Sequence, residues 1–144
     1  MLGIVIAGHG GFASGLLQAI EQVVGRQERC RAVDFPEGMS TIRLRLALRE
    51  ACSFCDAGNG LVILTDLLGG TPFRLAAELA MEKSRYEVIT GTNLQLAAEM
   101  MLEREGKTPA EFREMALTCG HRGLTSLWHE QQRQKCDDRT EDGI

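Results

Sequence analysis

The chain has no apolar run of the ~18–20 residues that a membrane-spanning helix needs. It also has no charged and then apolar leader with a cleavage site, so we expect the protein to stay in the cytoplasm. Its five cysteines are then expected to be reduced thiols. A net charge of −4 means that basic residues are not in excess, which argues against nucleic acid as a partner.

Several sequence motifs that would identify an enzyme or a metal site are also missing. There is no G-x-x-x-x-G-K-[ST] phosphate-binding loop and no G-x-S-x-G nucleophile elbow. Cys52-Ser53-Phe54-Cys55 is the single C-x-x-C pair, so no second pair completes a zinc site. The pair closes a helical pattern, whereas redox pairs stand at a helix N-terminus. We therefore interpret these cysteines as packing residues and expect no metal and no other cofactor.

What the chain does contain is a repeated alternation of short apolar runs and amphipathic helical patterns. The apolar, β-branched runs begin at residues 2, 30, 60 and 86, which is the spacing of βαβ units. This alternation predicts a three-layer α/β/α fold with a mainly parallel sheet in the flavodoxin-like order 2-1-3-4. The predicted strands are Leu2–Ala7, Cys30–Phe35, Gly60–Thr65 and Tyr86–Thr90.

Capping signals predict where some of the helices begin and end. Thr71 followed by Pro72 is typical of an N-cap and a first helical residue. Thr108-Pro109-Ala110-Glu111 is a capping box that opens a fifth helix. Gly120 stands where that helix is expected to stop.

The ends of the first and third strands carry the candidate chemistry. The first strand runs into Gly8-His9-Gly10-Gly11, and Asp66 follows the third. In such sheets ligands bind at the carboxyl ends of the strands, where the strand order reverses. Because strands one and three are neighbours there, we expect His9 and Asp66 to lie side by side. A carboxylate that accepts one ring N–H fixes the tautomer and leaves the other nitrogen free as a nucleophile.

Two glycine turns at this edge each open a helix. Helix N-termini present unsatisfied N–H groups and a positive dipole end, a setting that suits phosphate. A histidine in that setting can carry a phosphoryl group as well as bind it. The residues predicted to bind phosphate around His9 are Gly10, Gly11, Gly70, Thr71 and Thr65.

A competing interpretation uses the same glycines. The run from Gly8 to Ala13 satisfies the dinucleotide fingerprint G-x-G-x-x-G/A, and Asp34 ends the second strand, where a ribose-binding acid would stand. Against it, the residues after the fourth strand leave no room for a second βαβ half or a substrate domain. The alternative is therefore a small nucleotide-binding or regulatory module that uses the Gly8-His9-Gly10-Gly11 loop without catalysis.

Two long segments also resemble a known family. Residues 4–16 (IVIAGHGGFASGL) and 64–73 (LTDLLGGTPF) resemble the EIIA proteins of the mannose class of the bacterial phosphoenolpyruvate-dependent sugar phosphotransferase system. Residues 90–94 resemble that family's third signature, and the likeness covers residues 1–127. Residues 91–95 and 119–123 look most like the N-acetylgalactosamine and galactosamine branch.

The resemblance implies a phosphotransferase component with a phosphohistidine intermediate. It implies that His9 is the phosphorylated residue and that Asp66 hydrogen-bonds its ring. It further implies that HPr is the phosphoryl donor and that a separate EIIB protein is the acceptor. Through EIIB the chain would work indirectly with the membrane components EIIC and EIID, at the inner face of the membrane. The implied process is uptake of N-acetylgalactosamine or a related amino sugar.

The C-terminal region predicts a homodimer. Residues 1–129 are expected to form the EIIA domain and residues 130–144 a polar, poorly ordered tail. The fourth strand would be left as an open sheet edge, which proteins normally cover. Family members resembling this chain add an antiparallel strand to the neighbouring subunit's sheet, and residues 123–127 are the candidate for such an exchange. Alternatively, Leu124 and Leu127 pack back on their own subunit.

Overall fold

The computed structural model describes the backbone of residues 1–142 and the side chains of residues 1–138, so the last two residues of the predicted tail lie outside it. Strands and helices alternate up to the fourth helix, as predicted, and two further helices follow. The elements are β1 (Gly3–His9), α1 (Phe12–Val24), β2 (Cys30–Phe35), α2 (Thr41–Cys55), β3 (Leu61–Thr65), α3 (Thr71–Glu82), β4 (Tyr86–Ile89), α4 (Leu94–Glu103), α5 (Pro109–Gly123) and α6 (Leu127–Asp142).

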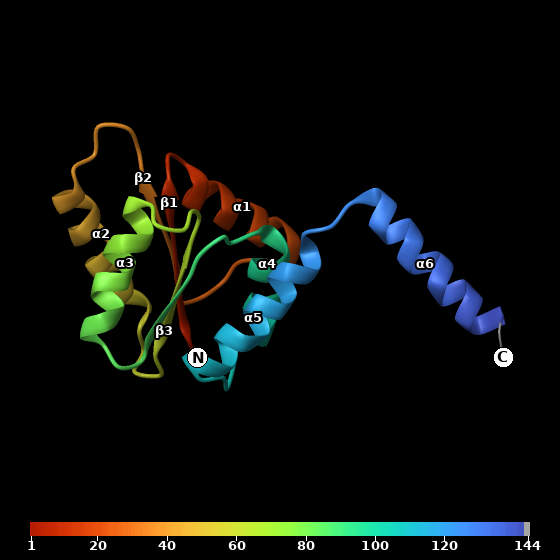
Figure 1. Ribbon diagram of the computed structural model, residues 1–144. Coiled ribbons are helices and arrows are strands. Elements are labelled where there is room, and N and C mark those ends of the chain that lie inside the picture. The colour runs from red at the N-terminus through yellow and green to blue at the C-terminus, as the bar shows by residue number, and fades with distance from the viewer. Residues whose placement is uncertain (143–144) are drawn as a thin grey trace.

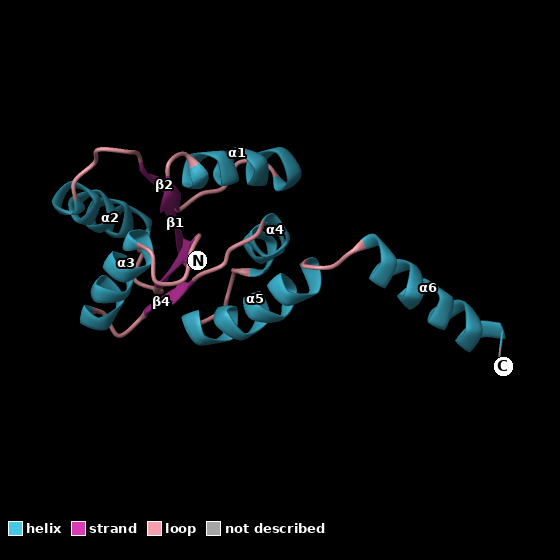
Figure 2. Ribbon diagram, turned by 45° about the horizontal axis from the view of Figure 1, so that its top comes forward, coloured by secondary structure: helices cyan, strands magenta, loops and turns pink. Residues whose placement is uncertain are grey.

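The four strands form one parallel sheet in the order β2-β1-β3-β4, which confirms the predicted order. Helices α2 and α3 cover one face, and α1, α4 and α5 cover the other, so the fold has three layers (Figures 1 and 2). Strand β1 extends two residues beyond its predicted end because His9 still pairs with Phe35 of β2. His9 is therefore the last residue of a strand and not part of the turn that follows.

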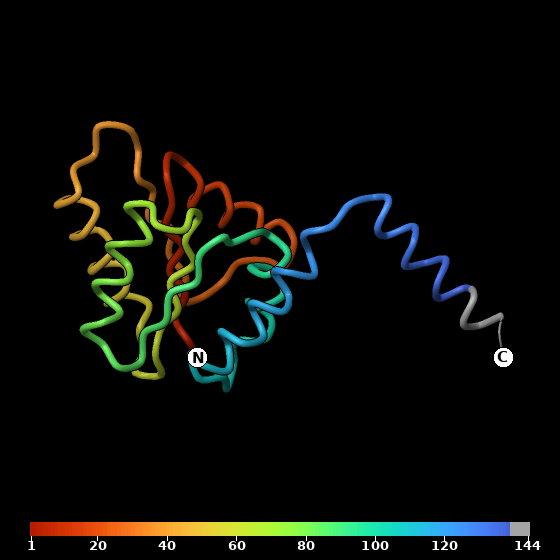
Figure 3. Tube along the Cα trace, in the orientation of Figure 1, coloured from red at the N-terminus to blue at the C-terminus, as the bar shows by residue number. Residues whose placement is uncertain are grey.

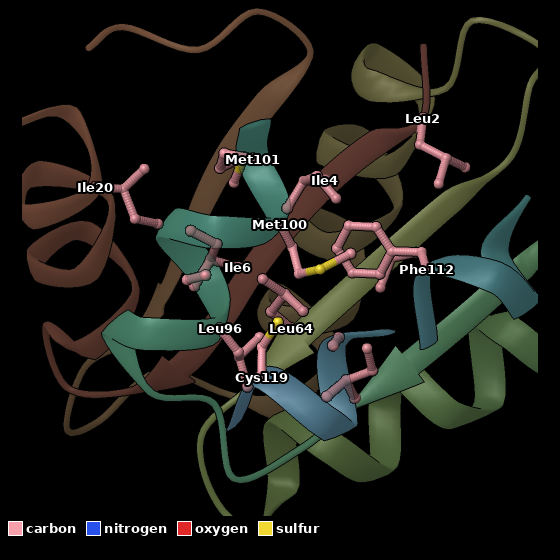
Figure 4. Packing of buried hydrophobic residues seen from close by; sticks show 14 of the residues in the cluster. Leu2, Ile4, Ile6, Ile20, Leu64, Leu96, Met100, Met101, Phe112 and Cys119 are labelled. Atoms are coloured by element: carbon pink, nitrogen blue, oxygen red, sulfur yellow. The ribbon is translucent and has the colours of Figure 1, made fainter. Parts of the chain in front are cut away.

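Each face of the sheet has its own buried cluster because side chains alternate along a strand. Ile4 and Ile6 of β1 belong to the cluster under α1, α4 and α5, whereas Val5 and Ala7 belong to the one under α2 and α3. Figure 4 shows members of the first cluster, among them Phe112 of α5. Burial on both sides holds β1 and β3 firmly and thereby fixes the residues at their carboxyl ends.

Two helix boundaries differ from the predictions. The N-cap of α3 is Gly70, and Thr71 is the first helical residue instead of the cap. Helix α5 continues through Gly120 to Gly123. A Cβ added to Gly120 would stand 2.8 Å from the Cδ2 atom of Leu96, so this glycine allows α5 to approach α4 closely. Its sequence signal therefore marks a helix–helix contact and not a helix end.

The C-terminal segment also differs from the prediction. Residues 124–126 form a loop, and α6 follows and points away from the body of the molecule (Figures 1 and 3). Residues 123–127 thus form no strand in this single chain, and residues 130–142 are helical. The polar residues of this segment are good helix formers, and the Ser126 hydroxyl caps the helix by accepting the His129 N–H at 3.1 Å. Strand exchange with a second copy stays a prediction.

Candidate active site at the carboxyl ends of β1 and β3

His9 and Asp66 meet at the carboxyl edge of the sheet, although they are 57 positions apart in the sequence. The Nδ1 atom of His9 lies 2.9 Å from the Oδ2 atom of Asp66. The same oxygen accepts the backbone N–H of His9 at 2.8 Å. This contact follows from the strand order, because His9 closes β1 and Asp66 directly follows the neighbouring strand β3.

Both oxygens of the Asp66 carboxylate accept hydrogen bonds. Its Oδ1 atom accepts the N–H of Leu67 at 2.8 Å. Burial by itself raises the pKa of Asp66, but the hydrogen bonds from the His9 backbone and ring and from Leu67 outweigh burial, so the pKa lies below its ordinary value. Asp66 is therefore an acceptor-only carboxylate at neutral pH, and the facing Nδ1 atom carries the ring proton. The Nε2 atom is then the ring nitrogen of His9 that Asp66 does not contact.

The opposite edge of the His9 ring is close to Gly70. A Cβ added to Gly70 would stand 2.8 Å from the Cε1 atom and 3.5 Å from the Nε2 atom of His9. Phe35 flanks the ring, with 5.9 Å between ring centroids. The His9 side chain is 44% exposed, whereas that of Asp66 is only 14% exposed. The site therefore presents an oriented ring nitrogen that an external group can reach.

Gly8 is a requirement of the site that the sequence patterns did not reveal. A Cβ added to Gly8 would stand 2.5 Å from the Cδ1 atom of Phe12 and 3.0 Å from the Cγ atom of Asp66. The first of these contacts is shorter than real Cβ contacts, so a side chain here would force the Phe12 ring to move, and the second is tight enough to press on the carboxyl group that hydrogen-bonds His9. The only sequence signal was the position of Gly8 in the glycine-rich turn, which does not show what its Cβ would meet.

Two of the predicted phosphate-binding glycines use their N–H groups within their own turns. The Gly10 N–H donates to the carbonyl of Phe35 at 2.8 Å, and the Gly70 N–H donates to the carbonyl of Leu67 at 3.1 Å. Gly10 has a φ of 53°, a conformation that favours glycine and that turns the chain from β1 into α1. These glycines thus shape the site, and their amides are not available as phosphate donors.

Thr65 is not placed to bind phosphate, contrary to the prediction. Its side chain is fully buried, and its hydroxyl donates to the carbonyl of Ile89 at 3.0 Å. The cause is the alternation of side chains at the end of β3, which turns Thr65 inward and the next residue, Asp66, toward His9. The hydroxyl therefore ties β3 to β4.

Gly11 and Thr71 are the two predicted phosphate-binding residues that remain. They stand at the N-cap of α1 and at the first position of α3. Amides in the first turn of a helix have no acceptor within that helix and can donate to an external anion. Neither helix has an acidic residue in its first turn.

The nucleotide-binding alternative depends on Asp34, which has another role. Its Oδ1 atom accepts the N–H of Ser14 at 2.9 Å, and its Oδ2 atom accepts the Ser14 hydroxyl at 2.6 Å. Asp34 therefore caps the first turn of α1, and both of its oxygens have partners. The carboxylate that would hold a ribose is thus already engaged, which argues against this alternative.

The C-x-x-C pair is buried, as predicted. Cys52 and Cys55 lie in the last turn of α2 and belong to the cluster under α2 and α3. Burial raises the pKa of Cys52 to about 12 and that of Cys55 to about 11. The thiols are therefore protonated at neutral pH and serve as packing residues. Within residues 1–138, no three His, Cys, Asp or Glu side chains gather into a metal site.

Comparisons with known proteins agree with this geometry. Residues 3–117 match the family EIIA-man, described as PTS system fructose IIA component. The protein YadI of Escherichia coli K12, named as a phosphotransferase enzyme IIA component, is 41% identical over 133 residues, which cover 92% of this chain and 91% of YadI. The mannose-specific EIIAB component of the same strain is 31% identical over 127 residues, which cover 88% of this chain but only 39% of that protein.

Solved structures agree as well. The crystal structure of phosphotransferase system component EIIA from Streptococcus agalactiae has a TM-score of 0.83 and is 31% identical, covering 90% of this chain and 99% of that chain. The family match runs from β1 into α5, so it includes His9 and Asp66. The N-acetylgalactosamine branch stays a prediction. The chain belongs to the EIIA-man family and is an EIIA component, a phosphoryl carrier, of the mannose, fructose and sorbose class of the phosphotransferase system.

Proposed function

We propose that His9 is the residue of this carrier that becomes phosphorylated, with phospho-HPr as donor and an EIIB component as acceptor. The observation that carries the proposal is the 2.9 Å contact between the His9 Nδ1 atom and the Asp66 carboxylate. It leaves the Nε2 atom as the nucleophile, on a ring that is nearly half exposed. A partner's phosphohistidine can therefore approach the reacting atom directly.

In the transfer step, the lone pair on the His9 Nε2 atom attacks the donor's phosphorus in line with the bond that breaks. The new P–Nε2 bond forms as the donor's P–N bond is lost, and that electron pair returns to the donor imidazole. The His9 ring keeps its Nδ1 proton and becomes positively charged opposite Asp66. Because donor and acceptor are both imidazoles, the step is close to thermoneutral and needs no metal. The same geometry serves onward transfer to EIIB.

Positioning and charge stabilisation are what the protein must supply in this step. The first-turn amides of α1 and α3, at Gly11 and Thr71, are the groups we assign to the phosphoryl oxygens. The Thr71 hydroxyl accepts one hydrogen bond, from Arg74, and keeps its own proton to donate. The absence of an acidic residue from the first turn of α3 supports its part of this assignment, whereas at α1 the Asp34 carboxylate already accepts the N–H of Ser14.

The test is phosphorylation in a mixture of phosphoenolpyruvate, enzyme I and HPr. The wild-type chain is expected to gain the mass of one phosphate, in a form that is labile to acid and stable to alkali. His9→Ala is expected to gain none, because the nucleophile is absent. His121→Ala and His129→Ala are matched controls that remove an imidazole elsewhere and should be labelled normally. Label on His9→Ala would contradict the assignment.

The proposal also concerns which EIIB accepts the phosphoryl group and which sugar is taken up. We propose an EIIB of an amino-sugar system, reached at the inner face of the membrane through EIIC and EIID. The support is the resemblance of residues 91–95 and 119–123 to the N-acetylgalactosamine branch. These two segments touch through Asn93, whose Nδ2 atom donates to the carbonyl of Gly120 at 3.0 Å. Phosphoryl transfer to an EIIB of that branch and to a mannose-specific EIIB would distinguish the acceptors.

A further inference from the structure

We propose that Arg74 contacts the phosphoryl group during its transfer to and from His9. The inference rests on the proposed function and adds to it a side chain that carries positive charge. Neither the strand-end pattern nor the family resemblance singled out this arginine. Its position in α3 and its lack of an acidic partner are the two observations that support the proposal.

The guanidinium of Arg74 lies at the end of α3 that is nearest to His9. Side chains in a helix lean toward its N-terminus, and the Nη2 atom of Arg74 donates to the Oγ1 atom of Thr71 at 3.2 Å. Thr71 is the first residue of α3 and directly follows Gly70, the residue against which the His9 ring edge lies. The guanidinium thus contacts Thr71, and Thr71 is the residue next to Gly70, which lies against the His9 ring.

Arg74 is also an arginine without an acidic partner in the described part of the chain. Its bond to Thr71 is the contact that holds it, and it forms no ion pair there. Two arginines of the neighbouring helix α2 are different, because both pair with glutamates of α3. These pairs are Arg45 with Glu78, at 3.2 Å, and Arg49 with Glu82, at 3.0 Å. The exposed guanidinium of Arg74 thus keeps its remaining N–H donors for an external acceptor.

The placement of this charge is unfavourable for the isolated protein. A cation near a helix N-terminus faces the positive end of the helix dipole, and no acidic residue in the first turn of α3 compensates it. An incoming phosphoryl group removes this conflict, because its oxygens accept hydrogen bonds from both the guanidinium and the first-turn amides. Arginine suits this role since its planar fork can donate two parallel hydrogen bonds to phosphate oxygens.

Arg74 would act on the transition state of the transfer already described. While the donor's P–N bond breaks and the P–Nε2 bond forms, the three equatorial oxygens keep their negative charge. Hydrogen bonds from Arg74 to these oxygens lower the barrier in both directions, although Arg74 itself forms and breaks no covalent bond. The maximal rate should therefore depend on Arg74 more strongly than the affinity for phospho-HPr does.

The experiment measures phosphoryl transfer from phospho-HPr by rapid quench, over a range of HPr concentrations. Arg74→Gln is expected to lower the rate at saturating HPr about 10- to 100-fold, with a change of less than about 2-fold in the half-saturating concentration. Arg74→Lys should recover part of the rate because it restores the charge but not the fork. Arg26→Gln is the matched control, since it removes one exposed charge at the other end of the sheet and should change neither parameter.

A second readout is made on the phosphorylated chain after HPr has been removed. In the phosphorylated chain, Arg74→Gln should shift the ³¹P resonance of phospho-His9, whereas Arg26→Gln should not. Thermal unfolding should show Arg74→Gln to be as stable as the wild type or slightly more stable, because a cation leaves the positive end of α3. A variant that is slow only because it is misfolded would instead lose stability.

Three results would overturn the inference. One is an unchanged saturating rate together with an unchanged ³¹P resonance in Arg74→Gln. Another is a raised half-saturating concentration at a normal saturating rate, which would assign Arg74 to the docking of HPr. In both cases the wild type still accepts phosphate, so the proposed function stands. A wild-type chain that accepts no phosphate from phospho-HPr would overturn the proposed function and this inference together.

Discussion

At the scale of single residues, the Asp66 carboxylate orients the ring and also closes the loop around it. One oxygen accepts both the ring and the backbone N–H of His9, and the other accepts the N–H of Leu67. The carboxylate thereby joins the end of β1 to the turn after β3. Because the pKa of Asp66 is lowered, these hydrogen bonds to an ionised carboxylate persist at neutral and mildly acidic pH.

Replacing Asp66 with asparagine should change both the chemistry and the pH dependence of stability. An amide can present an N–H to the ring and favour the wrong tautomer, so we expect transfer from phospho-HPr at pH 7 to be at least about 10-fold slower. Because the folded-state pKa lies below the ordinary value, the carboxylate contributes stability that is full above about pH 5 and is lost as the pH falls through about 4 and below.

Urea unfolding of the wild type and Asp66→Asn between about pH 3 and pH 7 measures this contribution. The difference in free energy of unfolding should be about 1–2 kcal/mol at pH 7 and should shrink toward acid. If the difference in free energy of unfolding were the same at every pH, ionisation of the Asp66 carboxyl group would not be its cause. A normal transfer rate would remove Asp66 from the site.

At the scale of elements, Asn93 links α4 to α5 at the end opposite the capping box of Thr108. The Oδ1 atom of Asn93 caps α4 by accepting the N–H of Leu96 at 3.0 Å, while its Nδ2 atom donates to the carbonyl of Gly120 in α5. The close approach of Gly120 to Leu96 lies beside this bond. Arg122 of α5 and Glu99 of α4 also form an ion pair at 2.9 Å, so polar and apolar contacts together join the two helices at this end.

Asn93→Ala should lower the free energy of unfolding by about 1–2 kcal/mol, because it removes a helix cap and leaves the Gly120 carbonyl without its donor. Asn93→Asp is the matched control, since it keeps the capping oxygen and loses only the donor, so its loss should be smaller. Urea unfolding measures both variants. Phosphoryl transfer to His9 should stay normal in each. Equal losses for the two variants would show that the bond to Gly120, and not the cap, matters.

At the scale of the whole molecule, β4 is one of the two edge strands of the sheet and lies next to an exposed apolar segment. A groove of about 380 Å³ at this edge is lined by residues that include Ile89, Leu96 and Leu124. Leu124 and Trp128 are 83% and 61% exposed. Within residues 1–142, no helix is long and apolar enough to cross a membrane. These features support the proposal that a second copy of the chain covers this edge.

We predict a homodimer that a charge at Leu124 disrupts. Leu124→Asp in the full chain should shift sedimentation from dimer to monomer at micromolar concentration, because a carboxylate would be buried against apolar groups. Its fold should be unaffected, since this side chain is exposed in the single chain. Met81→Asp, which charges an exposed position in α3, is the control and should stay dimeric. A wild-type chain that sediments as a monomer would defeat the prediction.

The sequence by itself determined the architecture and the central pair of the site. Hydrophobic runs at the spacing of βαβ units predict the parallel sheet, and the strand order then brings the ends of strands one and three together. That reasoning places His9 beside Asp66, as the 2.9 Å contact confirms. It works because side-chain periodicity and chain connectivity are properties of the sequence that the fold preserves.

Tertiary structure decided which polar groups remain available at the site. The sequence patterns marked Thr65, Gly10 and Asp34 as ligand-binding candidates, but each is engaged by the protein itself. Conversely, no pattern marked Arg74, whose role depends on where its guanidinium lies relative to the start of α3. The direction of an N–H, a hydroxyl or a guanidinium is set by local torsion angles and by neighbours distant in sequence, so residue types and spacing do not reveal it.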